Sequence, residues 1–480
     1  MTITEILLLV GVAVLYRLIS STRWGSSVRG WFLLTLSTLA IFWLQPAMPI
    51  RFLDFWLPVL TISITIFSWL LTAEKDEWRK RQNKITIAVI FLLILMIAFT
   101  RYLNLDGLLT ANRPPQTQQV LIGLIILIAV GALIGWLGKA SQRWLWVGIF
   151  LILLVFVFLK LPVLTLWLSS ILRNLVGQST STATALDIRW LGFSYVAFRL
   201  IHTLRDRQAG RLPAVSLQNY VNYVIFFPSI SAGPIDKLPR FDKDFQKPLT
   251  LDMAVFGSSF TRLLTGLFKK FAMADTLGLI ALNSQNATQL QANGWGWVMV
   301  YAYTFQIFFD FSGYTDIAIG LGKLLGIQLP ENFNKPYRRQ NLTQFWNNWH
   351  MTLTQWIRAY FFNPFTRSLR SKYRNLSPVW VILITQLSTM IMIGLWHGIT
   401  WNFVLWGIWH GLGMFVQNRY SDWVKPHLTK IEGKPTLQKG LSVINIAFTF
   451  HFVALGWIWF ALPEVSLSLL VFMQLFGLGG

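Results

Sequence analysis

The chain has 480 residues and a formal net charge of +22, yet only 12% of its residues are charged, 54% are hydrophobic, and the mean hydropathy is +0.52. Soluble domains carry roughly 25% charged residues, so this composition excludes a soluble globular protein and indicates a membrane protein. There is no cysteine, which excludes a disulfide framework, a thiolate nucleophile and a cysteine metal site. The basic residues are scattered through the predicted loops, so we attribute them to cytoplasmic loops and expect no nucleic-acid binding.

Long apolar stretches recur along the chain, and each predicts a membrane helix, because a crossing needs about 20 mostly apolar residues. The first six cover residues 3–18, 31–44, 52–71, 85–100, 120–137 and 144–159. Eight more cover residues 191–204, 220–230, 253–271, 296–325, 379–395, 401–416, 441–460 and 465–476. The sequence therefore predicts an all-α, polytopic transmembrane protein with about 11–13 membrane segments, some of them short.

The loops alternate between rich and poor in Arg and Lys along the first helices. The richer ones, around residues 17–29 and 75–84, are predicted to be cytoplasmic, which places the N-terminus outside. Composition divides the chain into N-terminal transmembrane helices over 1–185, a core over 186–416, and a basic cytoplasmic loop with C-terminal transmembrane helices over 417–480. The core is richer in Gly, Pro, His, Asn, Asp and Arg, so any chemistry is expected there.

His397 is an ionisable side chain within the apolar stretch 395–411. Such a group costs several kcal/mol at membrane depth unless it faces a protein interior or a water-filled cavity, so it is a candidate functional residue. Basic loops precede the predicted helix 379–395 and follow 401–416, which predicts a helical hairpin with His397 at its apex. Each arm is about 25 Å long against a hydrocarbon thickness of roughly 30 Å, so the apex is expected inside the membrane.

A second histidine, His350, lies in a polar pattern. Trp346, His350, Thr354 and Arg358 recur every four residues, which predicts one helical face. This face could orient a substrate or support an oxyanion; packing against a neighbouring loop is the alternative. The neighbouring Asn347 could bind a substrate or hold helices together.

The remaining titratable residues are weaker candidates. Asp310 and Asp316 are acids in an apolar stretch, and we expect them to pair with a cation or with hydroxyls such as Tyr314, in a scaffold role rather than in catalysis. No His, Asp or Glu cluster has ligand spacing, so no metal is expected. His410 follows His397 by 13 residues, about 220° around a continuous helix, which predicts a separate face and a structural role.

Six ordered blocks carry a resemblance to a known family. They are residues 227–235 (FPSISAGPI), 266–271 (GLFKKF), 309–322 (FDFSGYTDIAIGLG), 330–337 (PENFNKPY), 345–358 (FWNNWHMTLTQWIR) and 395–398 (LWHG). Together they resemble the membrane-bound O-acyltransferase (MBOAT) family, in the bacterial branch that includes alginate O-acetylation proteins and the D-alanyl transfer protein of teichoic acid synthesis. Residues 186–416 would then be the catalytic core.

The resemblance implies a helical shell around a tunnel and the transfer of an acyl group, here acetyl, from a thioester to a hydroxyl. His397 matches the essential histidine of the family and His350 its second characteristic histidine. The residues predicted to bind substrate are Trp346, Asn347, Trp349, Thr354, Arg358, Trp396, Asp310 and Tyr314. The donor would be acyl-coenzyme A or an acyl carrier protein thioester, with no tightly bound cofactor. The acceptor would be an extracytoplasmic glycan.

The same resemblance implies a multi-pass protein of the cell (inner) membrane, in contact with lipids. An extracytoplasmic acyltransferase is a further partner that it suggests. The chain departs from the branch at Ala359, where an acid is usual, and at residues 363–370, which replace a Gly-rich turn. These changes lie near the expected donor-facing surface, so the sequence leaves donor identity open.

The residues support acyl transfer independently. Neutral imidazole suits a general base at neutral pH, so His397 could accept the hydroxyl proton and return it to the leaving thiol. Two alternatives stay open. In a transporter or flippase the same His and Asp side chains would line a permeation path, and in a non-catalytic subunit of a polysaccharide synthase neither histidine would matter.

Overall fold

The chain is built from helices throughout the residues that the computed structural model describes, which are 2–74, 77–105, 107–138, 142–290, 293–428 and 434–478. It divides into two compact units, Met1–Leu263 with Ile317–Leu329, and Leu264–Asp316 with Pro330–Gly480. Every regular element in those described ranges is a helix, which confirms the all-α prediction.

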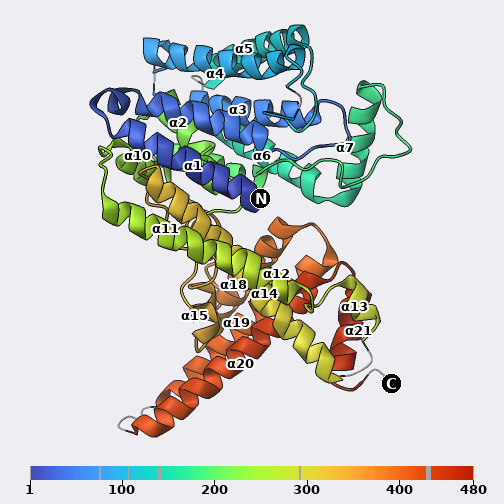
Figure 1. The fold of residues 1–480 in the computed structure, drawn as a ribbon. Coiled ribbons are helices and arrows are strands. Elements are labelled where there is room, and N and C mark those ends of the chain that lie inside the picture. The colour runs from blue at the N-terminus through green and yellow to red at the C-terminus, as the bar shows by residue number, and fades with distance from the viewer. Residues whose placement is uncertain are drawn as a thin grey trace. The chain divides into compact units, whose positions relative to one another are not determined.

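The first unit contains the helices of the N-terminal half (Figure 1). They are α1 (Ile3–Ser20), α2 (Arg23–Trp43), α3 (Leu53–Thr72), α4 (Arg81–Phe99), α5 (Thr117–Gly138), α6 (Arg143–Lys160), α7 (Pro162–Leu175), α8 (Phe193–Gln208), α9 (Leu217–Val224), α10 (Leu238–Gln246) and most of α11 (Met253–Leu267). The six predicted stretches before residue 160 correspond to α1–α6. In Figure 1, α4 and α5 lie side by side, as do α1 and α2. Helix α7 was not predicted.

Two buried arginines of the first unit bind the C-terminal end of α14 (Asn293–Leu324). Arg17 donates from Nη1 to the carbonyls of Lys323 and Leu324 at 3.0 and 3.1 Å, and Arg29 donates from Nη2 to Leu325 O at 3.3 Å. Both side chains are nearly inaccessible. The last carbonyls of a helix lack intrahelical partners and carry partial negative charge, so the two guanidinium groups satisfy and stabilise this end. The sequence predicts a basic cytoplasmic loop for these arginines. In the structure they are buried and bind backbone carbonyls.

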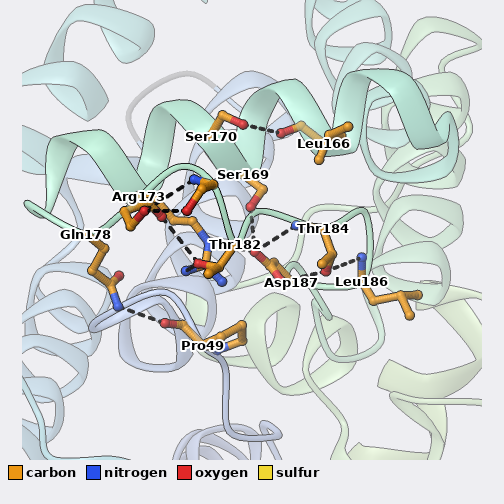
Figure 2. Close-up of polar contacts among 12 residues, drawn as sticks. Pro49, Leu166, Ser169, Ser170, Arg173, Gln178, Thr182, Thr184, Leu186 and Asp187 are labelled. Atoms are coloured by element: carbon orange, nitrogen blue, oxygen red, sulfur yellow. Dashed lines mark hydrogen bonds and ion pairs between the residues drawn. The ribbon is translucent and has the colours of Figure 1, made fainter.

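A buried ion pair closes the loop between α7 and α8 (Figure 2). Arg173 Nε donates to Asp187 Oδ2 at 2.8 Å, and Ser169 and Thr184 each donate a hydroxyl to the same carboxylate at 2.6 Å. Burial alone would raise the pKa of Asp187, but these hydrogen bonds outweigh it and hold the pKa well below its usual range. The carboxylate is therefore charged at neutral pH and fixes the loop.

The second unit contains the other helices (Figure 1). They are α12 (Asp275–Gly278), α13 (Ser284–Thr288), most of α14, α15 (Leu342–Trp346), α16 (Met351–Ile357), α17 (Asn363–Lys372), α18 (Pro378–His397), α19 (Trp401–Leu428), α20 (Pro435–Ala461) and α21 (Val465–Leu475). Two π-helical segments, Phe268–Ala274 and Arg358–Phe362, interrupt the α-helical geometry. Such segments are rare and are frequently found at functional sites.

Helices α18 and α19 form a tight antiparallel hairpin. Pro378 occupies the first turn of α18, a position where its missing N–H costs nothing. Near the apex, a Cβ added to Gly394 would lie 2.1 Å from Phe403 O, and one added to Gly407 would lie 2.5 Å from Ile391 Cα. Glycine is therefore required at both positions, because it lets the two backbones touch, as small residues do in membrane helix pairs.

Seven helices of the described residues are long and apolar enough to cross a membrane by length and composition. They correspond to α1, α3, α4, α5, α6, α18 and α20. The other predicted crossings are shorter or more polar; α9, for example, ends at Val224, and only a 3₁₀ turn, Phe227–Ser229, follows it in the predicted stretch 220–230. Helix α19 continues to Leu428, so the first part of the basic loop expected from residue 417 is helical, and residues 429–433 of that loop lie outside the described residues.

Candidate functional site

His397 is the last residue of α18, at the apex of the predicted hairpin. Residues 398–400 connect it to α19. The helix ends because Gly398 adopts an extended conformation, with φ −177° and ψ 145°. The side chain at this apex is half-buried.

Aromatic rings surround the His397 imidazole on several sides. Its ring centroid lies 4.4 Å from that of Trp396, 4.7 Å from Phe460 and 5.8 Å from Phe403. Because the side chain keeps part of its surface exposed, the aromatic wall does not seal it.

His350 lies between α15 and α16 and is almost fully buried. Its backbone is in the left-handed region, with φ 44°, where a side chain other than Gly is uncommon. Nδ1 lies 3.1 Å from Asn332 Oδ1, and the ring packs edge-on against Phe311 at 4.7 Å. Burial lowers the pKa of His350 to about 3, so the imidazole is neutral at physiological pH.

Trp396 brings the two histidines into one site. Its ring centroid lies 4.4 Å from that of His397 and 6.1 Å from that of His350. The indole is therefore a shared neighbour of both imidazoles.

The prediction of one continuous helix is wrong for this segment. It had placed four residues on a single helical face: Trp346, His350, Thr354 and Arg358. Helix α15 ends at Trp346, and α16 begins only after the left-handed residue His350. The turn nevertheless brings three of the four residues together. Thr354 Oγ1 donates to Trp346 O at 3.0 Å, and Arg358 Nη2 donates to Asn347 Oδ1 at 2.6 Å.

These residues line a cavity of about 220 Å³. Its wall combines polar and apolar side chains from several helices: Thr343, Trp346, Asn347, Thr354, Ile357, Arg358, Phe362, Gln386, Thr389, Met390, Ile393, Met414 and Asn418. Neither histidine is among them. A chain of ring contacts connects the cavity wall with His397, since Trp346 lies 5.4 Å from Trp406, which lies 6.0 Å from His397.

The remaining predicted site residues occupy other environments. Trp349 is buried in an aromatic cluster, 5.1 Å from both Phe333 and Trp457. Asp310 forms an ion pair with Lys270, and the neighbouring Asp316 pairs with Lys269 at 2.7 Å, as expected for acids with cationic partners. Tyr314 is buried on the same helix.

His410 is closer to the site than the sequence predicted. The continuous helix assumed between His397 and His410 does not exist, because α18 ends before α19 begins. His410 is fully buried and packs 4.9 Å from Trp406 and 5.0 Å from Trp346. It therefore shares Trp406 as a neighbour with His397.

Sequence reasoning missed Asn332, Phe311 and Trp406. Asn332 and Phe311 both lie in the family-like blocks, which was the available signal, but no periodicity connects them with His350. Trp406 is one of many tryptophans, and only the hairpin shows its place beside His397. Among the described residues, no group of three His, Asp or Glu side chains could hold a metal ion.

Comparison with known proteins identifies the family. The model of the MBOAT, membrane-bound O-acyltransferase family, matches residues 144–459, a range that contains all six blocks and both histidines. The chain is 30% identical over 346 residues to a protein of Pseudomonas syringae pv. tomato named probable alginate O-acetylase, covering 71% of this chain and 62% of that relative. The match thus spans less than two thirds of that relative's length.

Two other relatives carry different names. A teichoic acid D-alanyltransferase of Bacillus subtilis is 31% identical over 275 residues, which cover 56% of this chain and 68% of that protein. A peptidoglycan O-acetyltransferase of Helicobacter pylori is 34% identical over 275 residues, which cover 55% of this chain and 47% of that protein. The family match covers more than half of the chain and both histidines of the site, and so the chain belongs to the membrane-bound O-acyltransferase family.

Proposed function

We propose that this chain is a membrane O-acyltransferase that moves an acyl group, acetyl by preference, from a thioester donor to a hydroxyl of an extracytoplasmic glycan. The observation that carries the proposal is the family match across His350 and His397, together with the position of the half-buried His397 at the hairpin apex. The relatives in the comparison are named for acyl transfer to alginate, teichoic acid and peptidoglycan.

In the proposed reaction His397 is the general base. The acceptor oxygen attacks the thioester carbonyl while His397 takes the hydroxyl proton; the new C–O bond forms, the C–S bond breaks, and the proton passes to the leaving sulfur. The products are the ester and a free thiol, so no covalent acyl-enzyme is needed. General-base catalysis of this kind contributes about 10²–10⁴-fold in rate.

The donor is proposed to arrive from the cytoplasm as acyl-coenzyme A or an acyl carrier protein thioester, with the chain in the inner membrane. An exposed basic segment follows the second π-helix and contains Arg367, Arg370, Lys372 and Arg374. Clustered positive charge attracts either anionic donor and raises its encounter rate. An extracytoplasmic partner that completes transfer remains part of the proposal.

The cavity beside α15 and α16 is the proposed substrate-binding region. Arg358 and Asn347 provide a guanidinium and an amide at its wall, and Thr354 adds a hydroxyl. Such a mixture of apolar lining and a few polar groups is typical of small-molecule sites. Trp346 of the cavity wall contacts Trp406, which in turn contacts His397, so this region is connected to the proposed base through two indoles.

Reconstituted protein tests the proposal. Labelled acetyl-coenzyme A and acetylated carrier protein are each supplied with a glycan acceptor, and wild type is compared with His397→Ala. We expect labelled ester from wild type and a loss of about 10²-fold or more in the variant. Glycan movement that proceeds without any thioester would instead favour a transporter or flippase. Unchanged transfer in the folded variant would overturn the role of His397.

A further inference from the structure

Asn332 is a fully buried residue that binds the segment containing His350. Asn332 O accepts from Met351 N at 2.9 Å, and Asn334 N donates to Asn348 O at 3.0 Å. These backbone bonds hold residues 332–334 against residues 348–351. The Asn332 side chain therefore has a fixed position beside the imidazole.

The hydrogen bonds at Asn332 Oδ1 fix the orientation of its amide. Oδ1 accepts from Thr352 N at 3.2 Å and from Thr352 Oγ1 at 2.8 Å, and it lies 3.1 Å from His350 Nδ1. A backbone N–H can only donate, so the amide atom that faces Thr352 N must be the oxygen. The reversed amide would place an NH₂ group against that N–H.

The proton position on His350 follows from this orientation. An amide oxygen is only an acceptor, so Nδ1 must carry the hydrogen and donate it to Oδ1. In a neutral imidazole one nitrogen is a donor and the other an acceptor, which leaves Nε2 with a free lone pair. The structure shows Nε2 as a buried atom with no hydrogen-bond partner in the described residues.

His350 thus carries two unfavourable features at once. A buried polar atom without a partner costs about 1–3 kcal/mol, and a residue other than Gly in the left-handed region costs roughly as much again. Such costs cluster at functional sites. The His350 ring lies 6.1 Å, centroid to centroid, from the Trp396 indole, whose centroid lies 4.4 Å from that of His397, so the two imidazoles share one neighbour.

The geometry points to Asn332 as a positioning residue that holds His350 in the Nδ1–H tautomer, so that Nε2 accepts a hydrogen bond from the acceptor hydroxyl. This inference rests on the proposed acyl transfer to a hydroxyl. It replaces the expectation that His350 supports an oxyanion, because a bare Nε2 cannot donate. His350 orients the hydroxyl, and His397 removes its proton.

The tautomer can be measured without any substrate. The full chain, labelled with nitrogen-15 histidine and reconstituted in lipid, gives ring-nitrogen chemical shifts that distinguish a protonated from a bare nitrogen. The spectrum of His350→Gln assigns the His350 signals by their disappearance. We expect a protonated Nδ1 and a bare Nε2. A protonated Nε2 in wild type would overturn the inference, whatever the outcome of the activity assay.

Variants of Asn332 test the effect on the reaction. Asn332→Leu removes the acceptor at similar size, and Asn332→Asp keeps an acceptor oxygen. We expect kcat to fall roughly tenfold to hundredfold in the first, as for other residues that orient a functional histidine, and to recover at least in part in the second. The tautomer signal should change only in the first.

Thr352→Val is the matched control. It removes a hydrogen bond to the same Oδ1 but leaves the contact with His350 Nδ1. We expect the His350 tautomer to stay as in wild type. Wild-type kcat and an unchanged tautomer in a folded Asn332→Leu protein would refute the positioning role; should that variant not fold, the wild-type spectrum decides. Absence of transfer in wild type would refute the proposed function and leave the tautomer result standing.

Discussion

Lys269 Nζ lies 2.7 Å from Asp316 Oδ2, so a π-helical segment is tied to α14 by an ion pair whose acid is only 6% exposed. The adjacent pair, Lys270 with Asp310, joins the same two elements, but its acid is 52% exposed. The two acids have the same chemistry and the same partner element. They differ mainly in burial.

We therefore expect Asp316→Asn to destabilise the protein by about 3 kcal/mol, because the ion pair that it breaks contains a carboxylate that is only 6% exposed. Asp310→Asn should cost no more than about 1 kcal/mol, because solvent screens a carboxylate that is 52% exposed. Thermal or denaturant unfolding in the same detergent measures both. Equal losses in the two variants would mean that burial does not set the strength of these pairs.

The close contact between α18 and α19 predicts that a larger side chain at Gly407 destabilises the hairpin. A Cβ at position 407 would lie 2.5 Å from Ile391 Cα, so Gly407→Ala should separate the helices, lower stability by about 1–3 kcal/mol and reduce activity by moving His397. Gly440 in α20 has nothing within 4 Å of such a Cβ.

Gly440→Ala is the control, and we expect it to be neutral or to stabilise the helix by up to about 1 kcal/mol. Melting temperature and acyl transfer are measured on both. If Gly407→Ala matched the control in both measurements, the close helix contact would have no energetic weight.

The loop of Figure 2 predicts a dependence on pH. Asp187→Asn removes the charge that Arg173 binds, so we expect a loss of about 3–5 kcal/mol, whereas Asp422→Asn, in an exposed pair, should change stability by less than about 1 kcal/mol.

The pKa of Asp187 is lower in the folded protein than in the unfolded chain. Its stabilising effect is therefore complete above the unfolded pKa of about 3.9 and is lost as the pH falls toward the lower folded value. Unfolding followed from pH 7 to pH 3 should show a smaller pH dependence in Asp187→Asn than in wild type. A curve parallel to that of wild type would show that this carboxylate is not the group responsible.

Backbone strain at His350 can be separated from the function of its ring. Both His350→Ala and His350→Gly remove the imidazole, but only glycine adopts φ 44° without steric cost. We expect the glycine variant to be more stable than the alanine variant by about 1 kcal/mol, with acyl transfer impaired equally in both. If alanine were the more stable of the two, the left-handed backbone would carry no strain.

The sequence located most long helices because long apolar runs are a strong signal: α1–α6 correspond to the six predicted stretches, and the hairpin around His397 formed as expected. Short helices such as α7 and α15 were not predicted, because a few turns of mixed polarity resemble a loop. The predicted face through Trp346 and Arg358 failed for one reason. A left-handed turn at a histidine has no sequence signature, since glycine and asparagine are the residues that normally mark it.

The tertiary contacts of the site were less accessible to sequence analysis. The role of Trp396 as shared neighbour depends on the end of α18, and the pairing of Asp316 with Lys269 joins blocks 47 residues apart. Only the pairing of these acids with a cation could be anticipated, from the cost of a lone carboxylate among apolar side chains.

The bond from Arg17 to the carbonyl of Lys323 spans 306 residues of sequence. During synthesis at roughly 5–20 residues per second, about 15–60 s pass between the emergence of this arginine and of its acceptor. For that interval the first two helices hold guanidinium groups whose final acceptors have not been made, so water, lipid headgroups or a chaperone must solvate them. The N-terminal helices therefore reach their final bonding late in biogenesis, after α14 is complete.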